Sequence, residues 1–222
     1  MPGLVLLRGG GCLAGKVFES LRDSVSAESM GVVVWDNADV VHNSLSCFIH
    51  VRSGIEILEY IRSCPYDSIS VYVLVGCPSV RRCLVQEVRQ TLDTSPIPYQ
   101  FPNVIHKTAS MSNSAKLGIG NIVCAFAIVD SSVVGGDFCY AGGASFVGHD
   151  VVFGSFVNIS PHGVICGNVS LGDEVFIGAN AVVRDHVVVS DKSIVGAGAV
   201  VVSNIQDQSS TWVGNPAKQL HA

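Results

Sequence analysis

A histidine followed directly by an aspartate, His149-Asp150, is the pair of residues whose types could carry acid–base chemistry. Histidine titrates near neutral pH, so its imidazole can take a proton from an attacking amine or hydroxyl. The Asp150 carboxylate could orient that imidazole or stabilise its charge, which is the role of the third group in nucleophile activation. A solvated histidine on a turn gives the same pattern, so the pair alone leaves both interpretations open.

A glycine-rich stretch is a second candidate, for binding rather than for proton transfer. Residues 9–14, GGGCLA, fit the pattern G-x-G-x-x-A and stand between an expected strand and an expected helix. Such glycines let a phosphate approach a helix N-terminus, where backbone N–H groups favour negative charge. Asp36 and Asn37 end the next apolar run, where a ribose hydroxyl could be held, and Gly76 ends the third. A glycine-rich turn without a ligand remains the alternative interpretation.

The part of the chain that must position His149 and Asp150 has a sequence pattern that repeats every six residues. From Val151 to Asn204 the chain divides into nine hexads without a gap. A period of six fits neither a helix nor a simple strand, but it fits a triangular solenoid in which each hexad is one short strand and one corner. We expect the third residue of each hexad to point inward and the residue after it, which is mostly small, to let the chain turn. The expected inward residues are Phe153, Ile159, Ile165, Leu171, Ile177, Val183, Val189, Val195 and Val201.

The same frame extends backwards without a shift. Its third positions become Met111, Leu117, Val123, Val129, Gly135, Ala141 and Val147. Sixteen hexads, from residue 109 to residue 204, are therefore expected, with Gly135 and Ala141 as weak fillers of the core. His149 falls at the fifth position of its hexad, near a corner.

The first half of the sequence alternates strands with helices. Apolar runs at Leu4–Leu7, Gly31–Trp35 and Val71–Val75 predict strands, and residues 16–24, 55–63 and 80–90 have helical spacing. This pattern predicts a small three-stranded parallel βαβαβ unit of the Rossmann-like kind. Residues 95–103 carry three prolines and are interpreted as the passage between domains. We therefore expect an α/β domain at 1–103 and an all-β solenoid at 104–222.

Composition limits the classes of function. The net charge of −5 and the pI near 5.7 argue against nucleic acid or an anionic membrane surface as a partner. No apolar run reaches the length of a membrane span and the first residues lack the features of a signal peptide, so a cytoplasmic location is expected. Eight scattered cysteines without a C-x-x-C pair indicate neither a zinc site nor a disulfide framework.

The hexads from Gly148 onwards and the closing residues 213–218, VGNPAK, resemble the hexapeptide-repeat sugar acetyltransferases. Their members acetylate sialic acid or UDP-linked 4-amino sugars. The resemblance implies a left-handed parallel β-helix, acetyl-CoA as co-substrate, no metal and a homotrimer. It also implies that His149 is the catalytic base and that Asp150 is its partner.

The resemblance carries further roles over to single residues. In the family an N-terminal unit grips the nucleotide of the acceptor with a Gly-Gly-His loop, which here is Gly10-Gly11-Cys12. A second family histidine, which meets the donor thioester, corresponds to Asn158. Gly142 and Gly143 match contacts to the sugar nucleotide. The positions that match contacts to acetyl-CoA are Gly167, Ala179, Ala197 and Lys218.

The function that follows is transfer of an acetyl group from acetyl-CoA to the amino group of a UDP- or dTDP-linked amino sugar. An alternative keeps acetyl transfer but moves it to a hydroxyl, as on sialic acid. A third possibility, of another class, is a trimer that binds a sugar nucleotide or serves as structure without turnover. Cys12 and Asn158, which stand where the family has histidines, favour that third possibility.

Overall fold

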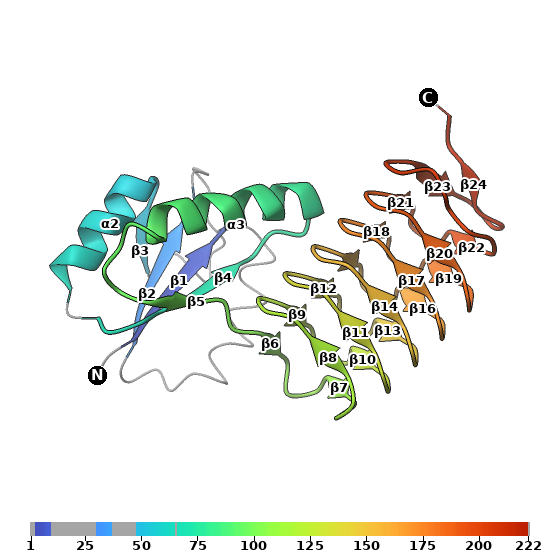
Figure 1. Ribbon diagram of the computed structural model, residues 1–222, viewed down its shortest axis with the longest axis horizontal. Helices are drawn as coiled ribbons and strands as arrows, with labels where there is room; N and C mark the ends of the chain where they lie inside the picture. Colours follow the sequence, from blue (N-terminus) through green and yellow to red (C-terminus); the bar gives the residue numbers. More distant parts are fainter. Residues whose placement is uncertain (1–2, 10–29, 37–47, 65, 222) are drawn as a thin grey trace. The chain divides into compact units, whose positions relative to one another are not determined.

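The computed structural model describes residues 3–9, 30–36, 48–64 and 66–221 (Figure 1). Contacts divide the chain into two compact units, one of residues 1–76 with 80–102 and one of residues 77–79 with 103–222. None of the helices in the described part of the chain has the length and apolar character that crossing a membrane requires.

The N-terminal unit contains a five-stranded parallel sheet in the order β3-β2-β1-β4-β5. The prediction of three strands is therefore wrong. The two additional strands lie at the edges of the sheet and are only three and two residues long. One of them, β5, lies inside the proline-rich segment, which is compatible with an edge position. The strands are β1 Gly3–Arg8, β2 Met30–Trp35, β3 Ile49–Val51, β4 Ile69–Val73 and β5 Tyr99–Gln100.

Two of the expected helices are present in this unit: α2, Gly54–Ser63, and α3, Pro78–Leu92. The start of α2 is capped by side chains, because the Ser53 hydroxyl accepts from the N–H of Glu56 and the Glu56 carboxylate accepts from the N–H of Arg52, the residue before the N-cap. Proline is the first residue of α3, where its missing N–H costs nothing. The helix expected at residues 16–24 and the glycine-rich loop before it lie outside the described residues.

The second unit is a left-handed parallel β-helix, which confirms the predicted solenoid. The second and third residues of each hexad form a strand, and strands eighteen residues apart pair in parallel, as Tyr140 does with Asn158. Face I contains β6 Val104–Ile105, β9 Ile122–Val123, β12 Tyr140–Ala141, β15 Asn158–Ile159, β18 Phe176–Ile177, β21 Ile194–Val195, β23 Thr211–Val213 and β24 Lys218–Gln219. Face II contains β7 Ser110–Met111, β10 Ile128–Val129, β13 Phe146–Val147, β16 Val164–Ile165, β19 Val182–Val183 and β22 Val200–Val201. Face III contains β8 Lys116–Leu117, β11 Val134–Gly135, β14 Val152–Phe153, β17 Ser170–Leu171 and β20 Val188–Val189.

The core of the solenoid is a continuous apolar column. All nine predicted inward residues from Phe153 to Val201 are buried, which confirms the prediction. The first residue of each hexad also points inward, which the sequence reading missed; Val157, Val175 and Ala199 are fully buried. Gly135 is a weak filler for a reason that the fold supplies. A Cβ there would lie 2.3 Å from the Phe153 ring, so that ring occupies the space in the core beside Gly135.

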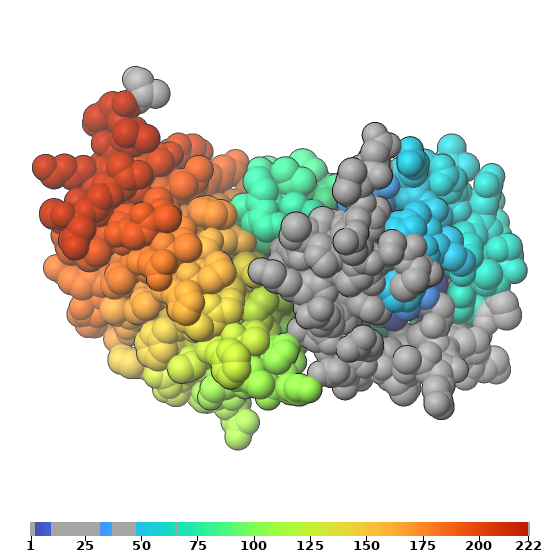
Figure 2. Space-filling view, turned by 180° about the vertical axis from the view of Figure 1, so that it is seen from behind, coloured from blue at the N-terminus to red at the C-terminus, as the bar shows by residue number. Residues whose placement is uncertain are grey.

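The corners turn at the sixth residue of each hexad, not at the fourth as expected. Every sixth residue from Phe126 to Lys192 has a left-handed φ, between 54° and 61°. The fourth residue is small because successive coils approach closely there. A Cβ on Gly136 would lie 2.6 Å from the backbone of Gly154, and one on Gly178 would lie 2.5 Å from the N of Ala197. Successive coils accordingly lie against one another in sequence order, from green to red in the space-filling view (Figure 2).

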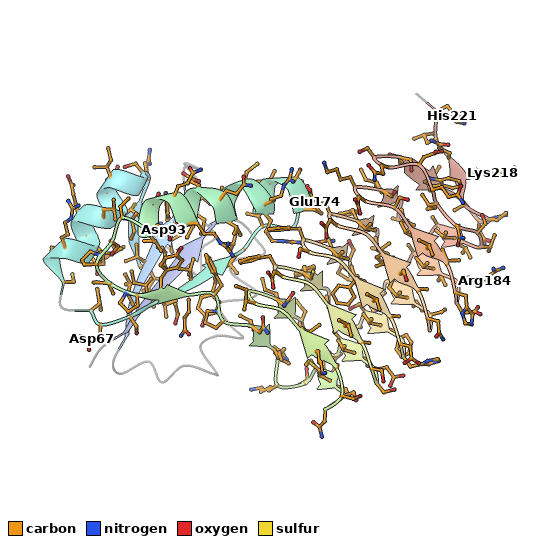
Figure 3. All side chains as sticks on the ribbon, viewed as in Figure 1. Asp67, Asp93, Glu174, Arg184, Lys218 and His221 are labelled. Carbon is orange, nitrogen blue, oxygen red and sulfur yellow. The ribbon has the colours of Figure 1, made fainter. Side chains whose placement is uncertain are left out.

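The C-terminal end of the solenoid is closed by a short hairpin. Strand β23 pairs in parallel with β21, and β24 pairs antiparallel with β23. The Trp212 indole packs against the core and donates to the Ser210 hydroxyl. This hairpin carries Lys218, labelled on the last part of the chain in Figure 3.

Candidate active site

The backbone of His149 and Asp150 is fixed by the coils on both sides of it. The two residues form the corner between β13 on face II and β14 on face III, hereafter a II–III corner. The Asp150 N–H donates to the carbonyl of Ser131 in the preceding coil, at 3.0 Å, and the His149 carbonyl accepts from the N–H of Asn168 in the next coil, at 2.9 Å. Asp150 has φ 56°, a conformation that aspartate tolerates better than most residues. The pair therefore projects from a rigid position of the solenoid.

The two side chains are in contact with each other. Nδ1 of His149 lies 2.9 Å from Oδ2 of Asp150, and the side chains are 54% and 55% exposed. Asp150 as a carboxylate can only accept, so a neutral imidazole donates its proton from Nδ1 and keeps a lone pair at Nε2. Among the described residues Nε2 has no hydrogen-bond partner. This is the arrangement of a general base that a carboxylate orients.

Along two of the three edges of the solenoid, several backbone N–H groups have no acceptor among the described residues. On the III–I corners, the N–H of the fifth residue is capped by a side-chain oxygen of the next coil at 2.7 to 3.1 Å, from Asp137, Ser155, Asp173 and Asp191. On the other two edges several of the corresponding N–H groups have no acceptor among the described residues. These open groups belong to Gly143, Ala179 and Ala197 on the I–II corners and to Gly167 and Asp185 on the II–III corners.

The open donors include three positions expected to contact acetyl-CoA. Gly167 lies on the same edge as His149, one coil further on. Ala179 and Ala197 lie on the neighbouring I–II edge, together with Gly142 and Gly143, so the strands of face II separate them from His149. The structure thus places the expected contacts on two different edges of one chain.

Asn158 does not lie at the corner of His149. It is the first residue of β15 on face I, 3% exposed, and its Nδ2 donates to the Ser160 hydroxyl at 3.2 Å. Its Oδ1 is buried without a partner among the described residues. Gly142, on the I–II edge, must be glycine, because a Cβ there would lie 2.6 Å from the N of Pro161.

In the N-terminal unit, two predicted binding residues and the first glycine of the glycine-rich motif lie at the carboxyl end of the sheet. Gly9, Asp36 and Gly76 follow the carboxyl ends of β1, β2 and β4, and the carboxyl ends of parallel strands are where ligands bind in open α/β sheets. Gly9 has φ 107°, which requires glycine, and Asp36 donates its N–H to the Val51 carbonyl. Four further predicted residues lie outside the described residues: Gly10, Gly11, Cys12 and Asn37.

A buried charge that the residue pattern did not predict lies at the same end of the sheet. Arg8 is 3% exposed and donates to the carboxylate of Glu87 on α3 at 2.8 Å. It also donates to the Trp35 carbonyl, and its guanidinium carbon lies 4.8 Å from the centre of the Trp35 ring. The only sequence signal was an arginine that ends an apolar strand. The cluster fixes the carboxyl ends of β1 and β2 against α3.

The chain is similar to known proteins at the level of solved structures. No protein-family model matches the chain, and neither does any curated protein. Among solved structures, the acetyltransferase domain of PglB from Neisseria gonorrhoeae FA1090 is 30% identical, with a TM-score of 0.81, and the match covers 98% of this chain and 99% of that one.

Two further structures are similar over nearly the whole chain. A mutant of perosamine N-acetyltransferase from Caulobacter crescentus, in complex with CoA and GDP-perosamine, is 28% identical, with a TM-score of 0.82 and coverage of 98% and 97%. WeeI from Acinetobacter baumannii AYE, 24% identical with a TM-score of 0.78 and coverage of 98% and 100%, shares the fold. The chain therefore belongs to the hexapeptide-repeat sugar N-acetyltransferases.

Proposed function

We propose that this protein transfers an acetyl group from acetyl-CoA to the amino group of a nucleotide-linked amino sugar, with His149 as the general base. The observation that carries the proposal is the imidazole held by Asp150 through Nδ1, with Nε2 open, at a corner of the solenoid. The similar Caulobacter enzyme was crystallised with CoA and with an amino sugar attached to GDP, which are the two substrates that such a reaction needs.

The chain's residues support direct attack on the thioester. Nε2 of His149 accepts a proton from the sugar amine as the amine nitrogen forms a bond to the thioester carbonyl carbon. The C–S bond then breaks, and the thiolate of CoA leaves and takes up the proton from the imidazolium of His149, which restores the base. The open N–H of Gly167, one coil from His149, is a candidate donor to the oxygen that becomes negative. Asp150 stabilises the imidazolium that forms meanwhile.

A homotrimer accounts for the two separate edges of candidate acetyl-CoA contacts. If face II of each chain faces a threefold axis, the II–III edge of one chain meets the I–II edge of its neighbour. His149 and Gly167 would then face the Ala179 and Ala197 of a neighbouring chain across one groove. Lys218 offers a charge for the phosphates of the coenzyme at the C-terminal end. The edges of one chain alone do not form such a groove.

The outer surface of face II supports this orientation. Its outward residues form an apolar row that only Ser110, in the first coil, interrupts, whereas the outward row of face III contains Lys116 and Ser170. A row of this kind is typical of a surface that another protein covers. The apolar members are Ile128, Phe146, Val164, Val182 and Val200.

A matched pair of variants tests the trimer. Val164 and Val152 are both outward valines at the second position of a hexad, on face II and on face III respectively. Val164→Glu should give monomers in sedimentation experiments and lose acetyl transfer, whereas Val152→Glu should remain trimeric and active. Monomers in the wild-type protein that transfer acetyl groups at full rate would refute the shared groove.

The acceptor is the second part of the proposal. We infer that the unit at residues 1–103 binds the nucleotide through Gly10, Gly11, Cys12, Asp36, Asn37 and Gly76, and that Gly142 and Gly143 meet the sugar. Asn158 would help to position the donor, because an amide can donate to a carbonyl oxygen but cannot relay a proton.

Thiol release from acetyl-CoA measures the function directly. The panel of acceptors contains UDP-, dTDP- and GDP-linked 4-amino sugars, the same sugars without nucleotide, and sialic acid. We expect release with at least one nucleotide-linked amino sugar and little with the free sugars. Release with sialic acid alone would favour transfer to a hydroxyl. Binding of a sugar nucleotide without any release would favour the non-catalytic alternative.

A further inference from the structure

We propose that Gly167 is a positioning residue for the catalytic imidazole. Because Gly167 has no side chain, the His149 ring can lie directly against its backbone, and this contact surface is called the seat. The inference rests on the proposed role of His149 and goes beyond the backbone contact to acetyl-CoA expected of Gly167. It concerns the missing Cβ, not the N–H.

The distances define the seat. A Cβ built on Gly167 would lie 2.6 Å from Cε1 of His149, 2.6 Å from Nε2 and 3.1 Å from Cδ2. These three atoms are Nε2 and the two ring carbons bonded to it. The other nitrogen, Nδ1, faces Asp150 at 2.9 Å. The imidazole therefore makes a hydrogen bond at Nδ1, while the part of the ring around Nε2 occupies the space that a Cβ of residue 167 would need.

The clash would fall on the ring, since the three atoms nearest to the added Cβ all belong to His149. The fold itself tolerates a Cβ at the fifth position of a hexad, because Ala125, Ala179 and Ala197 carry one there. Gly167 has no left-handed φ that would strain an alanine. The His149 side chain is 54% exposed and has room to rotate. An alanine at 167 should therefore displace the imidazole without unfolding the solenoid.

Displacement of the ring should affect the chemical step. Rotation away from residue 167 lengthens the 2.9 Å contact with Asp150 and moves Nε2 from the position where it would meet the acceptor amine. A misplacement of about 1 Å can reduce a rate by about 10²-fold. Binding of acetyl-CoA should change little, because alanine keeps the backbone N–H.

The test compares Gly167→Ala with Gly54→Ala as a control for added volume. A Cβ on Gly54 would lie 2.9 Å from the Thr91 hydroxyl, a side-chain tip in the N-terminal unit. For Gly167→Ala we expect kcat to fall by about 10²-fold, with the Kd for acetyl-CoA within about 2-fold of wild type and an unchanged melting temperature. The nitrogen resonances of the His149 ring, assigned with His149→Ala, should shift. Gly54→Ala should change neither kcat nor those resonances.

Three results separate the role of Gly167 from the proposed function. If Gly167→Ala leaves the His149 resonances and kcat as in wild type, the seat is refuted, whatever the role of His149. If Gly167→Ala loses acetyl-CoA binding in proportion to kcat, Gly167 acts on the coenzyme rather than on the ring, and the inference fails as well. If His149→Ala keeps full activity, the proposed function of His149 fails, yet shifted ring resonances in Gly167→Ala would still establish the seat.

Discussion

Replacing Asp150 by asparagine separates the orienting role of this residue from its place in the fold. Asparagine has the same shape and tolerates the φ of 56° at this position, so the backbone bond to Ser131 should persist. The change removes the charge that stabilises imidazolium. The new NH₂ group can also donate to Nδ1 of His149, which would put the ring proton on Nε2 and block the base.

The exposure of the pair sets the magnitude. The side chains are 54% and 55% exposed, so solvent screens their interaction, and such pairs contribute about 0–1 kcal/mol to stability. We therefore expect the free energy of unfolding of Asp150→Asn to stay within about 1 kcal/mol of wild type. The same screening limits the catalytic loss from the missing charge to about tenfold in kcat, which corresponds to about 1.4 kcal/mol in the barrier, and any transfer of the ring proton to Nε2 would add to this loss.

Thiol release at saturating acetyl-CoA, together with urea unfolding, measures both quantities. A tenfold loss of kcat with unchanged stability supports an orienting Asp150. Unchanged kcat would refute the reasoning, because the carboxylate would then do nothing for the imidazole. A loss of stability well above 1 kcal/mol would show instead that the residue acts through the fold.

Two further predictions concern the solenoid itself. Ile165→Ala removes a fully buried side chain from the core column and should lower the free energy of unfolding by about 2–5 kcal/mol in urea titrations; a loss below about 1 kcal/mol would contradict the continuous column. Gly136→Ala should lower the melting temperature, because its Cβ would lie 2.6 Å from the backbone of the next coil, whereas Gly76→Ala, whose Cβ meets nothing within 4 Å, should not. Equal melting temperatures for these two variants would contradict close stacking as the reason for small fourth residues.

Most of the solenoid fold could be predicted from the period of six. Large third residues such as Ile165 and Ile177 predicted the strands and the core, because an inward side chain must recur once per strand. The inward first residues were missed, because glycine at 163 and serine at 193 break their apolar pattern. The turn was placed at the small fourth residue, although sixth residues as different as Phe156 and Lys192 adopt the left-handed conformation.

In the N-terminal half, the apolar runs predicted the three central strands but not the edges of the sheet. Strand β3 is only three residues long, and β5 is two residues long and lies within a proline-rich segment. Their pairing with β2 and β4 forms only when the chain folds. Arg8 was not recognised as buried, since its partner Glu87 is far along the chain.

For the site, the sequence predicted the His149-Asp150 pair but not the contacts that fix it. The contact between His149 and Gly167 follows from their separation of eighteen residues, which is the length of one coil. The contact could therefore have been predicted from the repeat. The open N–H groups belong to the backbone, so the residue types do not predict them. The sequence does contain the side chains that cap the N–H groups on the III–I corners, such as Asp173, and these indicate that this edge differs from the other two.

The most direct test of the account is the rate of thiol release from acetyl-CoA by His149→Ala, with the best nucleotide-linked amino sugar as acceptor. A positioned general base contributes about 10²–10⁴ in rate, so the variant should be slower by that factor while it still folds and binds acetyl-CoA. A rate equal to that of wild type would contradict the central claim that His149 takes the proton from the acceptor.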